Sequence, residues 1–285
     1  MRFLLIISYN LIIYPSIFIL VLILSFFNVK IRKSVLGRFH SLAKIKKYFK
    51  SKKTAEVYWF HVSSLGEFYQ TKSIIELLKI SKPDIIIVLS FFSPSGFEKS
   101  YSPFVDLSFY IPFDFPWIVS AALQIINPKK VIICSNDIWP NLIWIAKKKN
   151  IHTSVFSFYI KRRSGLLKNI RKIIFRILYK DISSIYTVTK KDKTLLLDLL
   201  NDKNNTKIEV CGNPRYDTIF KDNTQNIVSK NIPILKRQKR IIIGSSHAED
   251  DFTIPIIISI IDEYPDAKVL YAPHEPNKKE INRLI

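Results

Sequence analysis

The chain alternates short apolar runs with segments that have helical spacing. From Val57 onward, continuous apolar runs occur at 57–62, 85–91, 131–134, 153–158, 184–188 and 208–211. Segments with helical spacing lie between them, at 68–80, 116–126, 140–149, 164–180 and 190–200. Continuous apolar strands that alternate with helices are typical of a parallel sheet covered on both faces. The pattern therefore predicts an α/β domain over residues 57–220.

A second unit of the same kind begins near residue 240. Residues 221–239 are polar and basic, which predicts a linker. They are followed by the apolar run RIIIG (240–244), a helical stretch (249–262) and the run AKVLYAP (267–273). A strand, a helix and a strand in this order predict a βαβ unit. We therefore expect one Rossmann-like domain, followed by the start of an incomplete second one over 240–285.

The N-terminus is apolar enough to bind a membrane. Between Arg2 and Lys30 lie 27 uncharged residues, whereas roughly 20 suffice to cross a hydrocarbon core. This predicts a membrane anchor at 1–29, in the form of a transmembrane helix. Asn10 and Pro15 interrupt the run, so a kinked helix or a deep monotopic anchor is an open alternative. A cleaved signal peptide is disfavoured, because the run is long and no small-residue cleavage site follows.

Positive charge is concentrated next to this apolar run. The formal net charge is +21, and residues 1–53 hold eleven Lys or Arg and no acid. We therefore predict a basic juxtamembrane segment at 30–56, which the positive-inside rule keeps, together with the body, in the cytoplasm. The chain has no zinc-finger spacing and no RNA-binding aromatic motif, so the charge does not indicate a nucleic-acid partner.

The cysteines and histidines do not indicate metal chemistry. Cys134 and Cys211 each close an apolar run, which predicts two reduced thiols in the core. Neither belongs to a CxxC pair, and the five histidines lack HExxH spacing. We therefore expect no protein-built metal site.

The first strand is followed by a candidate catalytic acid. The segment WFHVSSLGEF (59–68) consists of an apolar strand, a short turn, and Glu67 at the start of a helix. Ligands of a parallel sheet bind beyond the carboxyl ends of its strands, where this turn lies. An acid at a helix start can be an ordinary capping residue. It can also be a general base that removes a proton from a hydroxyl group.

The segment SSLGEF resembles the SVGE-type segment of the 3-deoxy-D-manno-octulosonic acid (Kdo) transferases. Six further segments resemble segments of that family in the same order. They are FFSPSGFE (91–98), YIPFDFP (110–116), DIWPN (137–141), CGNPRYD (211–217), GSSHAEDD (244–251) and APHEPN (272–277). The ordered set covers about residues 57–277, so it is far more specific than any one segment.

This resemblance implies a GT-B glycosyltransferase with two Rossmann-like domains. Such an enzyme transfers Kdo from CMP-Kdo, its donor substrate, to a lipid A precursor in lipopolysaccharide biosynthesis. Transfer inverts the anomeric centre and requires no cofactor and no protein-bound metal. The first domain mainly binds the acceptor, and the second mainly binds the donor. The resemblance also implies a location at the cell inner membrane.

The resemblance assigns roles to individual residues. Glu67 corresponds to the general base, and Arg215 occupies the place of a lysine that stabilises the transition state. The remaining assignments are acceptor binding by Ser64, Gly66 and Asp137, and donor binding by Ser245, Ser246, His274 and Glu275. Two positions depart from the family pattern. Ser135 replaces an acid, and His274 stands where an arginine is frequent, although a neutral imidazole binds phosphate more weakly.

Two alternatives remain open from the sequence. The segment LLKNIRKIIFRILYK (166–180) could rest on a membrane with its basic amphipathic face, or cover the sheet as an ordinary helix. The second domain has 55 residues over 231–285, and the family's glycine-rich and NPLE-type donor segments do not follow. The alternative function is therefore a truncated or split remnant that is not autonomous and retains only membrane and acceptor binding.

Overall fold

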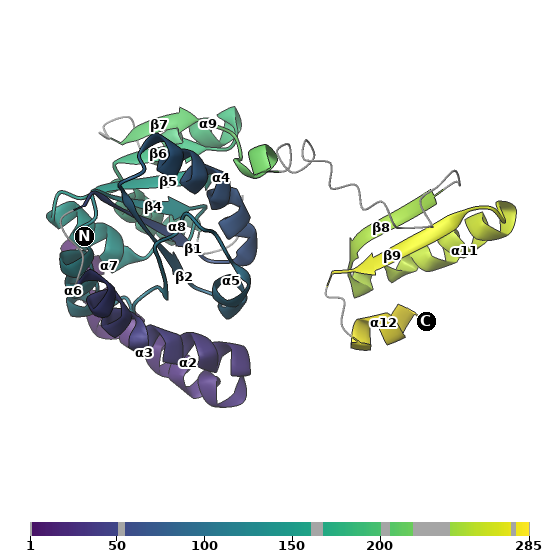
Figure 1. Cartoon of the computed structure of the whole chain (residues 1–285), viewed down its shortest axis with the longest axis horizontal. Coiled ribbons are helices and arrows are strands. Elements are labelled where there is room, and N and C mark those ends of the chain that lie inside the picture. Colours follow the sequence, from purple (N-terminus) through teal and green to yellow (C-terminus); the bar gives the residue numbers. More distant parts are fainter. Residues whose placement is uncertain are drawn as a thin grey trace. The chain divides into compact units, whose positions relative to one another are not determined.

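The computed structural model describes residues 2–50, 55–160, 168–200, 206–218, 240–274 and 278–284. The chain divides into two compact units, Met1–Gln225 and Asn226–Ile285 (Figure 1). The predicted linker over 221–239 lies outside the described residues. The first unit contains the predicted α/β domain together with the N-terminal helices, and the second contains the predicted βαβ unit.

The first unit is built on a parallel seven-stranded sheet with the order β3-β2-β1-β4-β5-β6-β7. Its strands are β1 (Val57–Val62), β2 (Ile86–Phe91), β3 (Leu107–Tyr110), β4 (Lys130–Cys134), β5 (His152–Phe158), β6 (Ser184–Thr187) and β7 (Lys207–Val210). This confirms the predicted parallel-sheet α/β class. The chain adds strands on one side of β1 and then returns to place β4 on the other side. Ligands of such sheets bind at this switch point, beyond the carboxyl ends of β1 and β4.

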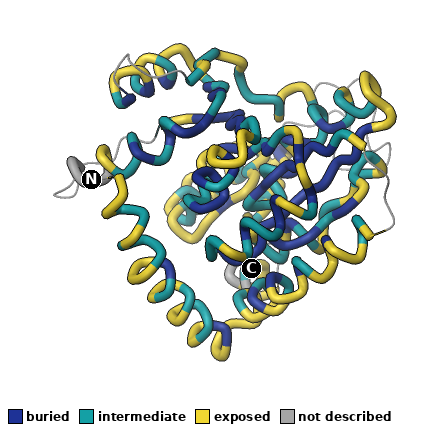
Figure 2. The backbone as a smooth tube through the Cα atoms, turned by 90° about the vertical axis from the view of Figure 1, so that its left-hand side faces the viewer, coloured by how far each residue is buried: buried dark blue, intermediate teal, exposed yellow. Residues whose placement is uncertain are grey.

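Helices cover both faces of the sheet. They are α4 (Leu65–Ser81), α5 (Pro94–Lys99), α6 (Pro116–Ile126), α7 (Pro140–Lys148), α8 (Lys168–Tyr179) and α9 (Lys190–Leu200). Successive residues of β1 point to opposite faces, so Trp59 and Phe60 belong to different hydrophobic clusters. Figure 2 shows the strands as the most buried part of the backbone. The sequence pattern missed β3 and α5, which are only four and six residues long.

The N-terminal helices form a hairpin. They are α1 (Arg2–Ser8), the π-helical turn η1 (Tyr9–Ile13), α2 (Tyr14–Phe27) and α3 (Val29–Phe49). By length and composition, Arg2–Phe27 is the only described helix that could cross a membrane. Asn28 separates α2 from α3, and its side chain accepts hydrogen bonds from the backbone of Lys30 and Ile31. The two helices lie side by side and project from the first unit (Figure 1).

Helix α3 is packed against the body, although the sequence suggested a separate basic segment at 30–56. It lies beside the edge strand β3, where Ser41 Oγ donates a hydrogen bond to Tyr110 O at 2.6 Å. A Cβ atom at Gly37 would lie 2.2 Å from the Tyr110 ring, so only glycine allows this approach. Ile45 is completely buried. Helix α3 thereby covers an edge that would otherwise expose unpaired backbone groups.

Two further predictions, on the cysteines and on the basic amphipathic helix, concern the first unit. Cys134 is buried as predicted, but Cys211 is exposed, because it follows the edge strand β7. Residues 164–167 of the predicted amphipathic helix lie outside the described residues. In the described part, Ile177 and Tyr179 are buried and Phe175 packs against the core. Helix α8 therefore covers the sheet.

The second unit has the predicted βαβ arrangement. Strands β8 (Arg240–Ser246) and β9 (Lys268–Pro273) are parallel neighbours. Between them lie the 3-10 helix η3 (Ala248–Thr253) and helix α11 (Ile254–Glu263), and helix α12 (Lys278–Leu284) follows β9.

Candidate active site

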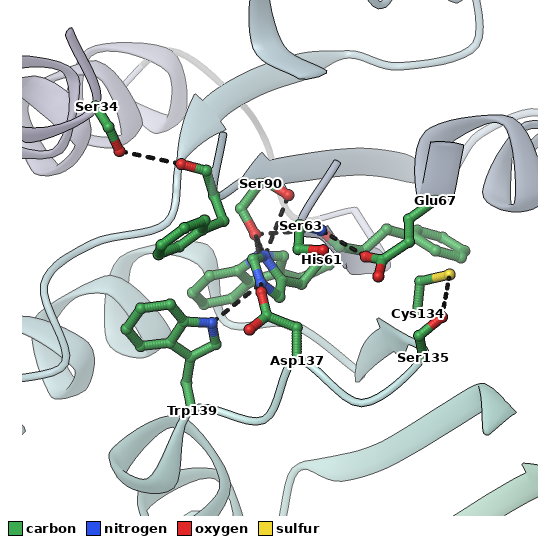
Figure 3. A network of polar contacts seen from close by, with 12 residues as sticks. Ser34, His61, Ser63, Glu67, Ser90, Cys134, Ser135, Asp137 and Trp139 are labelled. Atoms are coloured by element: carbon green, nitrogen blue, oxygen red, sulfur yellow. Dashed lines mark hydrogen bonds and ion pairs between the residues drawn. The ribbon is translucent and has the colours of Figure 1, made fainter. Parts of the chain in front are cut away.

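Glu67 lies in the first turn of α4, just beyond the carboxyl end of β1. Ser64 caps this helix, and its Oγ accepts a hydrogen bond from Glu67 N–H at 3.3 Å. In return, Glu67 Oε2 accepts one from Ser63 N–H at 2.6 Å (Figure 3). These reciprocal bonds resemble a capping box. Ser63 thus holds the Glu67 carboxyl group through its backbone N–H, and its hydroxyl group interacts with the same carboxyl group.

The two glycines near this turn have different structural roles. A Cβ atom at Gly96 would lie 3.0 Å from Phe91 Cδ1 and 3.2 Å from Ser64 C, so glycine allows α5 to support the turn. A Cβ atom at Gly66 would meet only Ser64 Oγ, at 3.9 Å. Packing therefore does not require glycine at 66, because the position that a Cβ atom would take is open.

Asp137 reaches the same edge of the sheet from the loop after β4. Ser135 turns that loop with a positive φ of 59°, which is uncommon for a residue other than glycine. Asp137 Oδ2 lies 2.9 Å from Nε2 of His61, a completely buried side chain of β1. The sequence did not identify His61, because a single histidine in an apolar strand carries no pattern.

The partners of His61 fix its proton on Nε2. Asp137 is an acceptor, so the 2.9 Å contact requires a proton on Nε2. Trp139 Nε1 lies 3.1 Å from the same nitrogen, but two N–H groups cannot share a bond, and the indole therefore donates to Asp137. On the other side of the ring, Nδ1 lies 2.9 Å from Ser90 Oγ and 3.2 Å from Ser90 O. His61 thus holds Asp137 in place (Figure 3).

The two carboxyl groups of the site have opposite pKa shifts. Burial raises the pKa of Glu67, assisted by the negative charge of Asp137 and opposed by the hydrogen bond from Ser63. Burial also disfavours the Asp137 carboxylate, but the hydrogen bonds from His61 and Trp139, with the charge of Arg38, lower its pKa overall. Asp137 therefore stays ionised, while Glu67 becomes a stronger base. Two carboxyl groups separated in this way are typical of acid–base sites.

Arg38 of α3 is a further residue that the sequence did not identify. Its side chain is buried, and the guanidinium carbon lies 4.5 Å from the centre of the Phe92 ring and 5.1 Å from that of the Trp139 ring. A cation over aromatic rings is stabilised without an ion pair. Helical spacing could have predicted that Arg38 is buried, because Arg38 lies on the same inward face of α3 as Val35 and Ser41. The many neighbouring bases obscured it.

The structure does not bring Arg215 into this network. Its side chain is exposed, and no described residue makes a hydrogen bond with its guanidinium group. The segment itself lies near α4, because Thr218 Oγ1 donates a hydrogen bond to Tyr69 O at 3.2 Å. The transition-state role of Arg215 therefore stays a prediction.

The predicted donor-binding residues of the second unit lie together at the carboxyl ends of β8 and β9. Ser245 Oγ is 2.7 Å from His274 Nδ1, and His274 N–H donates to Ser246 O at 2.9 Å. The ring of His247, which the sequence did not single out, lies 4.6 Å from that of His274. Glu275 lies outside the described residues. The described residues include no group of three or more side chains that could hold a metal ion.

A family profile described as 3-deoxy-D-manno-octulosonic-acid transferase (kdotransferase) matches residues 36–218, which is more than half of the chain. The chain belongs to this family. It is 24% identical over 224 residues to the 3-deoxy-D-manno-octulosonic acid transferase of Haemophilus influenzae, covering 77% of this chain and 52% of that protein. The transferase of Aquifex aeolicus is 25% identical over 225 residues, covering 78% and 56%. The chain spans about half the length of these Kdo transferases.

Solved structures of other proteins share the fold of this Kdo transferase family member at low sequence identity. The UDP-GlcNAc 2-epimerase from Neisseria meningitidis is 14% identical with a TM-score of 0.58, covering 81% of this chain and 68% of that chain. The corresponding epimerase from Rickettsia bellii has a TM-score of 0.51 at 14% identity, covering 81% and 66%. At this identity the likeness shows the fold alone. The neighbours are GT-B-like, as predicted for the chain.

Proposed function

We propose that the protein is a glycosyltransferase that transfers Kdo from CMP-Kdo to a lipid A precursor in lipopolysaccharide biosynthesis. Membership of the Kdo transferase family supports the sugar and the reaction type. The observation that carries the proposal is the geometry of Glu67. Its carboxyl group is held by Ser63 at the start of α4, burial raises the pKa of that group, and the residue lies where the sheet order reverses.

In the proposed reaction, Glu67 acts as the general base. A hydroxyl oxygen of the acceptor attacks the anomeric carbon of Kdo, and Glu67 Oε1 takes the hydroxyl proton. The bond between that carbon and the CMP phosphate oxygen breaks, and CMP leaves with the electron pair. The anomeric centre is inverted. Ionised Asp137 accepts a hydrogen bond from the acceptor, and Ser64 and Gly66 line the acceptor side.

The donor is proposed to bind mainly to the second unit. Ser245, Ser246, His274 and Glu275 hold CMP-Kdo, and the hydroxyl and imidazole groups near the strand ends are suited to a phosphate and a carboxylate. Arg215 stabilises the charge that develops on the leaving phosphate, since a guanidinium group can donate two parallel hydrogen bonds. The proposal includes no cofactor and no protein-bound metal.

The proposed location is the cytoplasmic face of the cell inner membrane, with the N-terminal segment as anchor and the body in the cytoplasm. The apolar helix Arg2–Phe27 and the eleven bases of residues 1–53 support this location. The lipid A precursor is itself a membrane lipid. No nucleic-acid partner is proposed.

The substitution Glu67→Gln tests the catalytic role. The glutamine oxygen can still accept the hydrogen bond from Ser63 N–H, so the helix cap is kept while the base is lost. We expect Kdo transfer to fall by roughly 10² to 10⁴ fold, the usual contribution of a general base. Transfer from CMP-Kdo to a lipid A precursor is measured in membranes from cells that produce the protein.

The matched control is Glu76→Gln, an acid of the same helix α4 that is predicted to keep wild-type transfer. Protein amounts are equalised by immunoblot. Wild-type transfer by Glu67→Gln would remove Glu67 from the role of base.

A further inference from the structure

The N-terminal helix is bound to the body along more than half of its length. Arg2 Nη2 lies 2.6 Å from Asp181 Oδ2, near the start of β6. Tyr9 OH donates a hydrogen bond to Asp114 Oδ2 at 2.8 Å, and Tyr14 OH accepts one from Asp114 N–H at 2.6 Å. These contacts begin at the first described residue. A helix that left the body to cross a membrane would lose them.

Asp114 makes this attachment specific. It is buried, and its carboxylate also accepts hydrogen bonds from Asn141 N–H at 3.0 Å and Leu142 N–H at 3.3 Å, at the start of α7. Asn141 Nδ2 donates to Asn10 Oδ1 at 2.8 Å. Buried polar groups without partners are unfavourable, so the N-terminal helix is needed to complete this network.

Aromatic contacts extend the attachment into α2. The ring of Phe18 meets the ring of Phe113 with a centroid distance of 5.0 Å and that of Phe115 with a distance of 5.2 Å. Only the nine residues from 19 to 27 remain beyond Phe18, which corresponds to about 14 Å of helix. A hydrocarbon core is roughly 30 Å thick. The attached helix is therefore too short to span it.

The free part of the hairpin has the composition of an interfacial element. Phe26 and Phe27 are 78% and 84% exposed. Lys30 and Arg32 follow directly and are also exposed, so a hairpin inserted end-on would carry both charges into hydrocarbon. Apolar residues of the attached part, such as Phe3, Leu4, Leu11 and Ile12, are exposed as well. Apolar side chains bordered by bases are typical of helices that lie in the plane of a membrane surface.

The hairpin lies at the catalytic edge of the sheet. Ser34 Oγ donates a hydrogen bond to Phe92 O at 3.0 Å, directly after the carboxyl end of β2 (Figure 3). Lys33 Nζ lies 2.8 Å from Glu98 Oε1 of α5, the helix that supports the Glu67 turn. A bilayer that contacts the hairpin would therefore meet the protein beside the candidate site.

We propose that α1, η1, α2 and the start of α3 form a monotopic anchor that lies in the surface of one anionic leaflet and does not cross the bilayer. The exposed apolar face contacts acyl chains, and Lys30 and Arg32 bind lipid phosphates. The N-terminus and the body then lie on the same side of the membrane. This inference rests on the proposed function only in taking the acceptor to be a membrane lipid.

Side-specific labelling tests the topology. Cys211 is exposed and reports the side of the body, whereas Cys134 is buried. In a Cys211→Ser background, a short polar tag with one cysteine is placed before Met1. The tag cysteine is read in this variant, and Cys211 is read in the untagged wild-type chain. Each protein is treated with a membrane-impermeant maleimide in spheroplasts and in inside-out vesicles. We expect both to react from the same side. Reaction from opposite sides would show a spanning helix and overturn the proposal.

Vesicle binding tests the anchor surface with the purified full chain. Binding to phosphatidylcholine vesicles is compared with binding to vesicles that also contain phosphatidylglycerol. We expect the anionic vesicles to bind more tightly, and Lys30→Glu with Arg32→Glu to weaken that binding about tenfold or more. Phe26→Asp with Phe27→Asp is expected to abolish binding.

The matched control is Leu77→Asp, which changes a 66% exposed leucine of α4 and is expected to bind like wild type. Wild-type binding by the Phe26→Asp, Phe27→Asp variant, or equal binding to neutral and anionic vesicles, contradicts the proposal. Neither labelling nor binding depends on Kdo transfer, so a failure of the proposed function would leave both readouts intact.

Discussion

At the scale of single residues, Glu67 combines a structural role with the proposed role of general base. Its Oε2 accepts the hydrogen bond from Ser63 N–H at the start of α4, and burial raises the pKa of its carboxyl group, which suits a base. The two interpretations that the sequence left open, capping acid and general base, are therefore compatible. What the sequence did not contain is the neighbouring pair of His61 and Asp137, which fixes a negative charge close enough to act on the pKa of Glu67.

Asp137→Asn should shift the pH dependence of Kdo transfer. The raised pKa of Glu67 means that the base is lost as pH falls through a value above the ordinary one. Removing the charge of Asp137 lowers that pKa, so the acid limb of the pH profile moves to lower pH. The measurement is the transfer rate against pH for both proteins. An unmoved limb, or one moved to higher pH, would show that the two groups do not interact.

Asp114 should make stability depend on pH in the direction opposite to that of an ion-paired acid. Burial raises the pKa of Asp114 from 3.8 to about 7. The contribution of Asp114 to the free energy of unfolding is therefore fully present below about pH 3.8 and is lost as the pH rises through about 7. The total loss is about 4 kcal/mol. We expect the Tm of wild type to fall relative to Asp114→Asn between pH 4 and 8. A Tm difference that stays constant with pH would contradict this.

At the scale of elements, α3 shows how packing decides the role of a segment. Its composition is basic, and its sequence predicted a juxtamembrane segment. Its inward face, which includes Gly37, Arg38 and Ile45, instead covers the edge strand β3 and completes the candidate site. Helix α8 provides the complementary case, because its basic amphipathic pattern belongs to a helix that covers the sheet.

Gly37→Ala should destabilise the first unit. The new methyl group would lie 2.2 Å from the Tyr110 ring, and overpacking of this kind costs about 1–3 kcal/mol. Gly66→Ala is the control for stability, since its methyl group would meet only one atom, at 3.9 Å. Thermal unfolding of the two variants distinguishes them. Equal Tm values would show that α3 adjusts without cost.

At the scale of the whole molecule, the sheet and the N-terminal hairpin form one structural unit. The division into compact units falls between Gln225 and Asn226, and everything before it, including the predicted anchor, belongs to the first unit. The proposed membrane anchor and the candidate site therefore belong to one body, which carries the hairpin at the edge where Glu67 lies.

Deletion of residues 2–27 should damage the body and not merely release it from the membrane. The deletion removes Tyr9 and Tyr14 from Asp114 and uncovers Phe113 and Phe115. The Asp114 carboxyl group keeps its bonds from Asn141 N–H and Leu142 N–H. The buried Asp114 N–H, however, loses its partner Tyr14, and a buried polar group left unsatisfied costs about 1–3 kcal/mol. We expect low soluble yield and a lowered Tm, whereas the full chain with Phe26→Asp and Phe27→Asp keeps its Tm. A soluble deletion variant with an unchanged Tm would show that the helix is only a tether.

The sequence by itself determined the features that depend on nearby residues. The period of apolar positions gave most strands and helices, and the strand–turn–helix pattern placed Glu67 at the start of α4. The ordered motifs gave the family. Short elements such as β3 escaped, because four residues carry too little periodicity.

Only the tertiary structure decided which isolated polar residues are buried together. Asp114 meets Tyr9 across 105 positions of sequence, and His61 meets Asp137 across 76. Contacts of this kind cannot be predicted from local sequence. The two partners are far apart in the chain, and folding alone brings them together. The same reason explains the N-terminal helix. Its composition indicates affinity for a membrane, but the hydrogen bonds that attach it to the body exist only in the folded chain.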